Sequence, residues 1–317
     1  MMKAVCRRTL VVAIFGLFLA FGTPAQAEWP ERPIQIVVPY KAGGDSDFNA
    51  RTYSKYLQSE LGVPLAVVNV SGGGGGIGAR RVKDATPNGY TVLLWHEAML
   101  VNSATGLIDF TFRDFEMVGM AAQEPGTMIC VTKDAKWQTF DDLMKDSAAR
   151  PGKVSFAASL GGTTYLMAQL LNKAGADFNI IDHGGTGPRV TALLGGHVDV
   201  IPNPVGSVIS YINNGDFRAL ATTRTTRHPK LPQVETLQEL GYDVTFQYRY
   251  FFMFPKGTPQ SIVDKFAAAV KKVATTNKEY AAEIDKAYLQ APFFMNAEDT
   301  IKELEIQDKV VRSVKLK

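Results

Sequence analysis

Cysteine is scarce in this chain: its 317 residues include two, Cys6 and Cys130. Cys6 lies in an N-terminal segment that we expect to be removed, which leaves Cys130 alone. A single thiol cannot form an internal disulfide, and the apolar neighbours of Cys130 favour a buried strand position over a nucleophile. We therefore expect neither a disulfide nor thiol chemistry.

Long hydrophobic runs are missing too, apart from one near the N-terminus. Residues 10–21 are apolar and uncharged, three basic residues precede them, and Ala25-Gln26-Ala27 follows shortly after. This run has 12 residues, whereas a membrane-spanning helix takes roughly 17 to 25. The order of these features is typical of a secretory signal peptide. We predict that residues 1–27 are a signal peptide cleaved after Ala27, and that the mature protein is periplasmic.

Net charge is almost absent. The 34 Lys and Arg residues outnumber the 31 Asp and Glu residues by three, and Lys3, Arg7 and Arg8 all lie in the predicted signal peptide. The mature chain is therefore formally neutral, and it has no cluster of basic residues. Because nucleic acids and anionic membranes both require a local excess of Lys and Arg, neither is expected as a partner.

Patterns that carry catalysis or metal binding are missing as well. His96, Glu97 and His183 are candidates for a metal set, but the four histidines are scattered without metal-ligand spacing. The hydroxyl residues within 159–165 have no G-x-S-x-G context that would make one of them a nucleophile. We expect no metal, no cofactor and no enzymatic activity.

What the sequence does contain is an alternation of β-rich apolar runs with helical patterns. Such alternation predicts α/β architecture, with largely parallel sheets covered on both faces. The predicted helices include residues 47–60, 163–174 and 188–194. The predicted strands are residues 34–40, 65–70, 91–96, 127–132, 154–159, 179–183, 198–203 and 218–223.

Eight strands suit two sheets better than one, so we predict two domains. The first boundary falls at Pro125-Gly126, and the second in the polar stretch 223–237. The expected division is residues 28–124 for the first domain, 125–226 for the second, and 227–317 for a return through the hinge to the first domain. Thr258, followed by Pro259, is the expected N-cap of one C-terminal helix and Asn296 of another. Because the chain would pass between the two domains twice, we expect a hinge beside a ligand cleft.

Three glycine-containing loops join a predicted strand to a predicted helix: residues 39–51, 67–81 and 159–165. In parallel sheets, ligands bind beyond the carboxyl ends of the strands, where such loops lead into helix N-termini. Backbone N–H groups and the positive end of the helix dipole favour an anion there. The three loops therefore indicate an anion-binding cleft.

The five glycines at 72–76 also satisfy a dinucleotide pattern through Gly73, Gly75 and Gly78. A run of glycines matches many patterns by chance, this loop follows the second strand rather than the first, and a secreted protein meets little NAD. A Walker A loop is excluded, since no Lys-Ser or Lys-Thr follows the glycines. An NAD-dependent enzyme is one alternative function for this chain, and a sensor subunit for a membrane histidine kinase is another.

At these loops the sequence resembles a known family, the extracytoplasmic solute-binding receptors of tripartite tricarboxylate transporters, also called Bug or TctC-like proteins. The resemblance covers nearly all of the mature chain, and its motifs are "WPERPIQIVVPYKAGGDSDFNAR", "NVSGGGGGIGA", "ATPNGYTVLL", "PGKVSFAASLGGTTYLMAQLL", "ALLGGHVDVIPNP", "FRALATT" and "FPKGTPQSIVDKF". It implies a type II periplasmic-binding-protein fold, with two α/β domains and a hinged ligand cleft. It also implies a monomer that presents a small organic anion, mostly a carboxylate, to the large and small membrane subunits of a permease.

Carried over by position, the resemblance places the carboxylate clamp at Tyr40 to Asp47, facing Ser159 to Tyr165 across the cleft, and implies that the glycine run lines the pocket. The full set of expected ligand-binding residues is Tyr40, Lys41, Ala42, Gly43, Gly44, Ser46, Asp47, Ser71, Gly72, Gly74, His96, Glu97, Ser159, Gly161, Gly162, Thr163, Thr164, His183, Asn203 and Arg249.

The chain departs from the family pattern at two cations. Lys41 stands where a small or apolar residue is common, and Arg249 begins Arg249-Tyr250-Phe251 in place of a frequent Trp-Phe-Gly. Together they would favour a ligand with more than one negative group, such as a dicarboxylate, and an aromatic acid is the other expectation. Glu97 would either neutralise Arg249 or receive an amino group or hydroxyl of the ligand.

Overall fold

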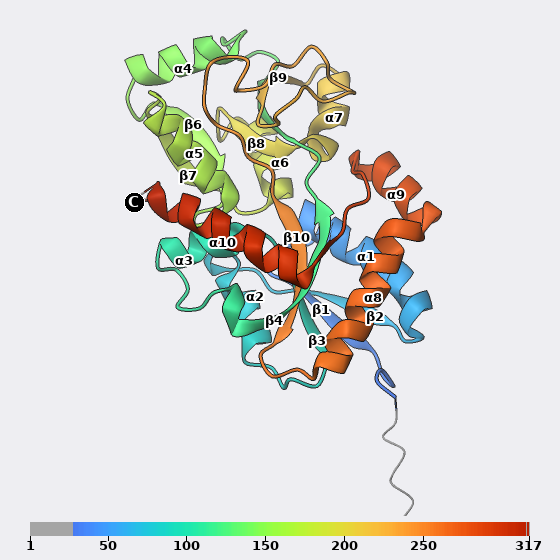
Figure 1. Ribbon diagram of the computed structural model, residues 1–317. Coiled ribbons are helices and arrows are strands. Elements are labelled where there is room, and N and C mark those ends of the chain that lie inside the picture. Colours follow the sequence, from blue (N-terminus) through green and yellow to red (C-terminus); the bar gives the residue numbers. More distant parts are fainter. Residues whose placement is uncertain (1–27, 315, 317) are drawn as a thin grey trace, which may run out of the picture.

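The computed structural model describes residues 28–314 and 316 (Figure 1). The predicted signal peptide lies outside the described residues. Within the part of the chain that is described, no helix combines the length and the apolar character that crossing a membrane requires.

The first domain is built on a six-stranded sheet in the order β11-β4-β10-β3-β1-β2. β1 pairs in parallel with β2 and β3, whereas β10 runs antiparallel to both β3 and β4. The strands are β1 (Ile34–Val38), β2 (Leu65–Asn69), β3 (Thr91–Trp95), β4 (Phe115–Gln123), β10 (Arg249–Pro255) and β11 (Met295–Asn296).

The second domain repeats this arrangement. β5 pairs antiparallel with β8 and β9, β6 pairs in parallel with β7, and a bridge between Phe156 and Val200 joins the two groups. The resulting order β7-β6-β8-β5-β9 matches β2-β1-β3-β10-β4, and in both domains the antiparallel strand is the one that enters from the other domain. The strands are β5 (Thr127–Thr132), β6 (Val154–Ala158), β7 (Phe178–Asp182), β8 (Ile201–Pro204) and β9 (Phe217–Thr222). This is the predicted type II fold of two α/β domains.

Helices cover both faces of the first sheet. Ile34, Ile36 and Val38 of β1 face one core, with α1 and α8, whereas Val37 faces a second core, with α2, α3 and α10. Burial on both faces explains why the strands read as continuous apolar runs. The helices are α1 (Asp45–Leu61), η1 (Gly73–Gly75), α2 (Gly76–Lys83), α3 (Ala98–Ala104), η2 (Phe112–Asp114), α4 (Phe140–Ala149), α5 (Thr163–Lys173), α6 (Thr186–Leu194), α7 (Val205–Asn213), α8 (Gln260–Thr276), α9 (Lys278–Tyr288) and α10 (Ala297–Ser313).

The eight predicted strands all form, each within three residues of the expected ends, as β1 to β3 and β5 to β9. The long strands β4 and β10 were not predicted as strands. Asn296 caps α10 as expected, because its side chain accepts the backbone N–H of Asp299 at 2.9 Å. The expected cap at Thr258 is wrong: α8 begins one residue later than predicted, and the Thr258 hydroxyl donates to the Pro255 carbonyl instead.

The chain crosses between the two sheets twice, after β4 and between β9 and β10, and the crossing segments are hydrogen-bonded to each other. The Glu124 N–H donates to the Tyr248 carbonyl at 2.9 Å, and the Arg224 guanidinium donates to the Pro125 carbonyl at 2.5 Å. The domain boundaries proposed from the sequence stay a prediction.

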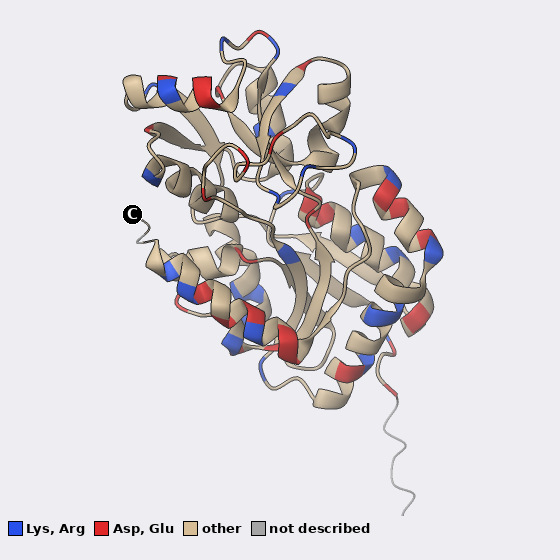
Figure 2. Ribbon diagram, turned by 45° about the horizontal axis from the view of Figure 1, so that its top comes forward, with Lys and Arg blue, Asp and Glu red and all other residues tan. Residues whose placement is uncertain are grey.

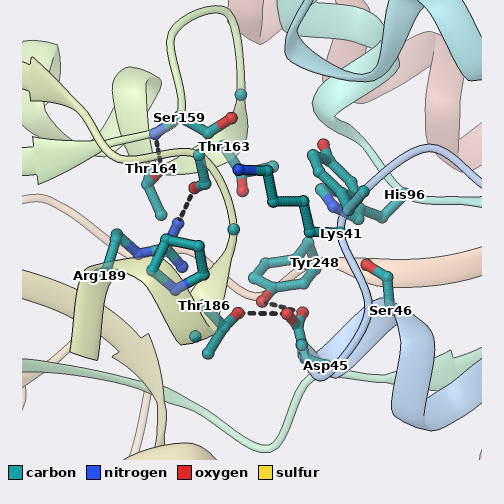
Figure 3. A pocket seen from close by; sticks show the side chains of 17 residues that line it. Lys41, Asp45, Ser46, His96, Ser159, Thr163, Thr164, Thr186, Arg189 and Tyr248 are labelled. Carbon is teal, nitrogen blue, oxygen red and sulfur yellow. Dashed lines mark hydrogen bonds between the residues drawn. The ribbon is translucent and has the colours of Figure 1, made fainter. Parts of the chain in front are cut away.

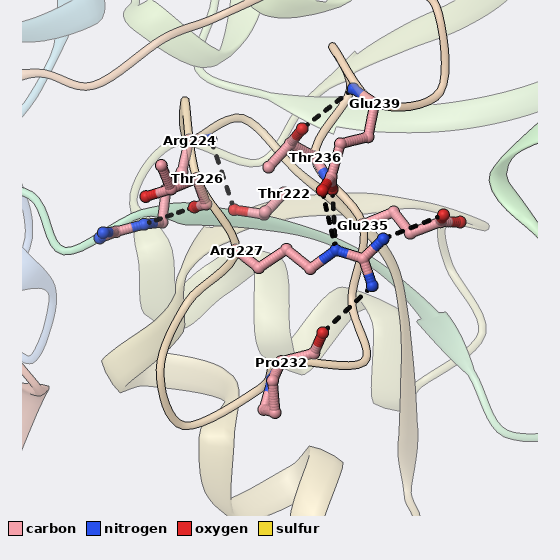
Figure 4. Close-up of polar contacts among 8 residues, drawn as sticks. All are labelled: Thr222, Arg224, Thr226, Arg227, Pro232, Glu235, Thr236 and Glu239. Atoms are coloured by element: carbon pink, nitrogen blue, oxygen red, sulfur yellow. Dashed lines mark hydrogen bonds and ion pairs between the residues drawn. The ribbon is translucent and has the colours of Figure 1, made fainter.

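The long return after β9 folds on itself around one arginine (Figure 4). Arg227 donates through Nε to both carboxylate oxygens of Glu239, at 2.9 and 3.0 Å, and through its other nitrogens to Glu235 and the Pro232 carbonyl. Such a fork of charge-assisted bonds holds a fixed geometry. The return segment is therefore ordered without a helix or strand of its own.

Charged side chains of both signs are interspersed over the outer helices (Figure 2). On α10, Lys302 pairs with Glu298 and Arg312 with Asp308, each one helical turn apart. A mixed surface of this kind agrees with the formal neutrality of the mature sequence.

Two helical glycines provide a test of how tightly the first domain packs. A Cβ on Gly78 would lie 2.6 Å from the Val70 carbonyl oxygen and 2.9 Å from Pro39 Cα, whereas a Cβ on Gly187 would have its nearest neighbour 3.9 Å away. Alanine is favoured over glycine in a helix by about 1 kcal/mol, but backbone cannot yield as a flexible side chain does. We expect Gly78→Ala to lower the free energy of unfolding by about 1 to 3 kcal/mol and Gly187→Ala to leave it equal or higher. Urea denaturation checks both, and equal effects would contradict the packing at Gly78.

Candidate functional site

A small cavity of about 30 Å³ lies between the two domains (Figure 3). By the space that one buried water requires, it holds about two water molecules. It is lined by Tyr40, Lys41, Gly44, Asp45, Ser46, His96, Ser159, Gly162, Thr163, Thr164, Gly184, Gly185, Thr186, Gly187, Pro188, Arg189 and Tyr248.

Three helices begin at this cavity: α1 from the first domain, and α5 and α6 from the second. Their N-cap residues are Gly44, Gly162 and Gly185, which have no side chain to satisfy the free N–H groups of the first turn. By contrast, α4 and α10 begin with side-chain caps, at Thr139 and Asn296. Three uncapped N-termini directed at one space present N–H donors and positive dipole ends to an anion.

Arg189, in the first turns of α6, is the buried cation of the cavity, with 4% of its surface exposed. Its Nε donates to Asn203 Oδ1 at 2.8 Å and its Nη1 to the Gly184 carbonyl at 2.6 Å. Asn203 is fixed in turn by donating to the Thr186 carbonyl at 3.1 Å. None of the hydrogen bonds among the described residues uses Nη2 of Arg189, so a fixed guanidinium with one unused nitrogen lines the cavity.

Asp45, at the start of α1, is the buried anion of the cavity, 8% exposed. Its carboxylate accepts hydrogen bonds from the hydroxyls of Thr186, Tyr248 and Tyr250, and the Tyr248 bond measures 2.9 Å. Burial acts to raise the pKa of Asp45, but the hydrogen bonds from Thr186 and Tyr250 outweigh it, and the pKa lies below its usual value. Asp45 is therefore ionised at neutral pH, and its bond to Thr186 joins the two domains.

His96 forms part of the cavity wall, where its ring packs against three tyrosines, Tyr40, Tyr248 and Tyr250. Its ring stacks on Tyr40, with centroids 5.4 Å apart, and its Nδ1 accepts the Ala98 N–H at 3.2 Å. Burial lowers the pKa of His96 to about 4. The imidazole is neutral at physiological pH and contributes shape and a hydrogen-bonding edge rather than charge.

The glycine run lies beside the cavity and forms a contact between the domains. A Cβ on Gly74 would lie 2.7 Å from the Leu160 carbonyl oxygen in the second domain. The Asn102 side chain donates both to the Gly74 carbonyl, at 3.2 Å, and to the Gly161 carbonyl across the cleft, at 2.9 Å. The run therefore permits close approach of the domains instead of lining the ligand space.

The structure brings many of the predicted site residues together and separates others from them. Ala42, Gly43 and Asp47 belong to the first loop but do not line the cavity; Asp47 pairs with Arg51 at 2.9 Å. Four other predicted residues lie at the domain contact beside the cavity or outside that contact: Ser71, Gly72, Gly74 and Gly161. His183 directly precedes the lining residue Gly184, and Asn203 hydrogen-bonds Arg189 without lining the cavity. The predicted residues that line the cavity are Tyr40, Lys41, Gly44, Ser46, His96, Ser159, Gly162, Thr163 and Thr164.

Arg249 and Glu97 are not in the cavity wall. The Arg249 guanidinium donates to Glu303 of α10 at 3.0 Å, outside the cavity wall. This placement does not favour the expected role of Arg249 in holding a second negative group. The Glu97 carboxylate accepts the backbone N–H of Arg249 at 2.7 Å and does not pair with its guanidinium. Burial raises the pKa of Glu97 to about 8, with Oε1 buried and without a hydrogen-bond partner.

Sequence reasoning missed the charged centre of the site, Asp45 and Arg189, together with Thr186 and Tyr248. A signal for two of these was present, since residues 183–189, "HGGTGPR", form another glycine loop that joins a strand to a helix. Among the described residues, no group of three His, Cys, Asp or Glu is placed to hold a metal.

The fold and the cavity define a class: a two-domain binding protein whose domains meet around a small cavity. The family model for the tripartite tricarboxylate transporter family receptor, TctC, matches residues 49–316. The chain belongs to this family of periplasmic solute-binding receptors, which are not enzymes.

Individual relatives agree with this assignment. The chain is 34% identical to the protein BugT of Bordetella pertussis over 266 residues, which cover 80% of this chain and 81% of BugT. It is 33% identical to a protein encoded in the tcbD-tcbE intergenic region of a Pseudomonas species, over 84% of this chain and 81% of that one. Among solved structures, the periplasmic binding protein BugD superposes with a TM-score of 0.82 at 25% identity, over 91% of this chain and 99% of BugD.

Substitutions of two arginines, one inside the cavity wall and one outside it, test the geometry of the site. We expect Arg189→Gln to weaken carboxylate binding about 10- to 150-fold, the range for losing a charge-assisted hydrogen bond of roughly 1.5 to 3 kcal/mol. Arg249→Gln, the matched control, should change affinity less than twofold, because Arg249 bonds Glu303 outside the cavity. Isothermal titration calorimetry measures both, and a larger loss in Arg249→Gln would reverse the assignment.

The buried Glu97 makes stability depend on pH. The folded state holds its proton up to about pH 8, whereas the unfolded chain releases it near the ordinary glutamate pKa of roughly 4.3. This group therefore lowers the free energy of unfolding as pH rises across that window, by about 1.4 kcal/mol per pH unit. Glu97→Gln should make the fall between pH 5 and 8 less steep, while Glu305→Gln, at a half-buried position where the carboxylate pairs with Arg113, should not. Urea denaturation across that pH range measures it, and an unchanged slope in Glu97→Gln would count against the buried proton.

Proposed function

We propose that this protein is a periplasmic receptor that captures a small organic anion with at least one carboxylate and delivers it to the membrane subunits of a tripartite tricarboxylate permease. The observation that carries the proposal is the convergence of three uncapped helix N-termini and the buried Arg189 on one cavity between the domains. Helix N-termini and a guanidinium favour negative charge, and they come from both domains; the start of α1 also carries the Asp45 carboxylate, so the groups that favour an anion most are Arg189 and the starts of α5 and α6. In this proposal residues 1–27 direct export and are removed after Ala27.

Closure of the domains is part of the proposal. A cavity of about 30 Å³ is smaller than a dicarboxylate. In this proposal the domains move apart to admit the ligand, and they then close around it with a wider cavity than the one seen here. Asp45 with Thr186, and Asn102 with Gly161, are hydrogen-bonded pairs that cross the cleft. A ligand that touches both domains shifts the population toward the closed form in proportion to its preference for that form.

Two solved structures that share the fold suggest acids to include in a ligand test. MatC of Rhodopseudomonas palustris, solved with malate bound, shares the fold at 22% identity and a TM-score of 0.83. A second protein of that organism, also 22% identical, was solved with adipate. Both acids therefore belong among the ligands to be tested, together with tricarboxylates and aromatic acids.

The test is a thermal-unfolding screen of residues 28–317 against mono-, di- and tricarboxylates, aromatic acids, amino acids and nucleotides. A ligand that binds only the folded state, at 100 times its Kd, adds about 2.7 kcal/mol to stability. We expect one class of carboxylate to raise the Tm by several degrees.

Arg189→Gln is the control for this screen, because a stabilisation that survives it does not arise at the cavity. The proposed function would be contradicted if NAD alone raised the Tm, or if no carboxylate of any class raised it.

A further inference from the structure

We propose that the ligand carries a protonated amine as well as a carboxylate, with the amine against Asp45 and the carboxylate against Arg189. This inference rests on the proposed receptor function and names the class of substrate at the same site. It follows from the charges that line the cavity.

The first observation is a buried carboxylate that has no cation of its own. Asp45 is held by three hydroxyl groups, and no Lys, Arg or His nitrogen of the described residues lies within ion-pair distance of it. Asp47, two residues further on in the same helical turn, does have such a partner, in Arg51 at 2.9 Å. Hydroxyl donors offset the burial of this charge, and Arg189 acts on it only from beyond ion-pair distance. A positive group of a ligand placed against Asp45 would be attracted to it at close range.

The second observation concerns the other side chains of the cavity wall and whether any of them acts as a counter-ion to Asp45. His96 is neutral, since burial lowers its pKa to about 4. Arg189 is already committed through Nε and Nη1 to Asn203 and Gly184. Lys41 is exposed and extends over the cavity (Figure 3). The enclosed part of the site therefore presents one negative and one positive centre, which suits a zwitterion.

The third observation is that each centre belongs to a different domain. Asp45 begins α1 of the first domain, and Arg189 lies in α6 of the second. Thr186, three residues before Arg189, donates to Asp45 and so sets the two centres on facing walls. A zwitterion bridges the walls with favourable charge at both ends, whereas a plain dicarboxylate brings a second negative group toward Asp45, where like charges repel.

The experiment uses matched acids that differ only by an α-amino group: succinate with aspartate, glutarate with glutamate, and propionate with alanine. Calorimetric titration of residues 28–317 measures each Kd. We expect the aminated member of at least one pair to bind at least tenfold tighter than its partner.

Three variants separate the charge of Asp45 from its role in joining the domains. Asp45→Asn removes the charge and should reduce the preference for the amine at least tenfold. Thr186→Val removes the hydrogen bond across the cleft but keeps the charge, so it should weaken both members of a pair alike. Asp47→Asn, the matched control on the same turn, should leave the preference unchanged.

The outcomes distinguish the two proposals. If unaminated acids bind as tightly as aminated ones, the inference is overturned and the receptor function stands. The same holds if Asp45→Asn weakens both members of a pair alike, as Thr186→Val should. If no acid of any pair binds, and the wider carboxylate screen is also silent, the receptor function fails with it.

Discussion

The carboxylate of Asp45 is the interaction on which the site depends. It accepts hydrogen bonds from Thr186 in the second domain and from Tyr248 and Tyr250 on the chain that returns through the hinge. One buried group therefore joins both domains and the hinge strand. Because the same group lines the cavity, a substitution of Asp45 itself changes both the charge of the cavity wall and the hydrogen bond that crosses the cleft.

Glycine makes that construction possible in two different ways. At Gly44, Gly162 and Gly185 the missing side chain leaves the helix N–H groups uncapped and open to the cavity. At Gly74 and Gly206 it allows the domains to touch, since a Cβ on Gly206 would lie 2.3 Å from the Tyr288 carbonyl oxygen. The first role is electrostatic and the second is steric. A sequence shows the glycines, but only the folded chain shows which role each one has.

Local patterns predicted eight of the strands, and two of the three predicted glycine loops contribute residues to the cavity wall, because apolar runs and loop-to-helix glycines can be recognised within a few residues. The strand β10 was missed because its position, between β3 and β4, is set by partners more than a hundred residues earlier in the chain. Arg249 was placed in the site for the same reason: its partner Glu303 is 54 residues away in the sequence. Conversely, Asp45 and Arg189 could not be recognised as site residues from the sequence, because they come together only where the two domains meet at the cavity.

The buried acids of this protein are divided by the number of donors around them. Asp45, with three hydroxyl donors, stays ionised, whereas Glu97 and Glu124 each have one carboxylate oxygen without a partner, and burial raises the pKa of each to about 8. Both neutral acids lie at the hinge, since Glu124 begins the first crossing and Glu97 holds the Arg249 N–H at the end of the second. The ionised carboxylate therefore lies in the cavity wall, whereas the two carboxyl groups with raised pKa values lie where the chain crosses between the domains.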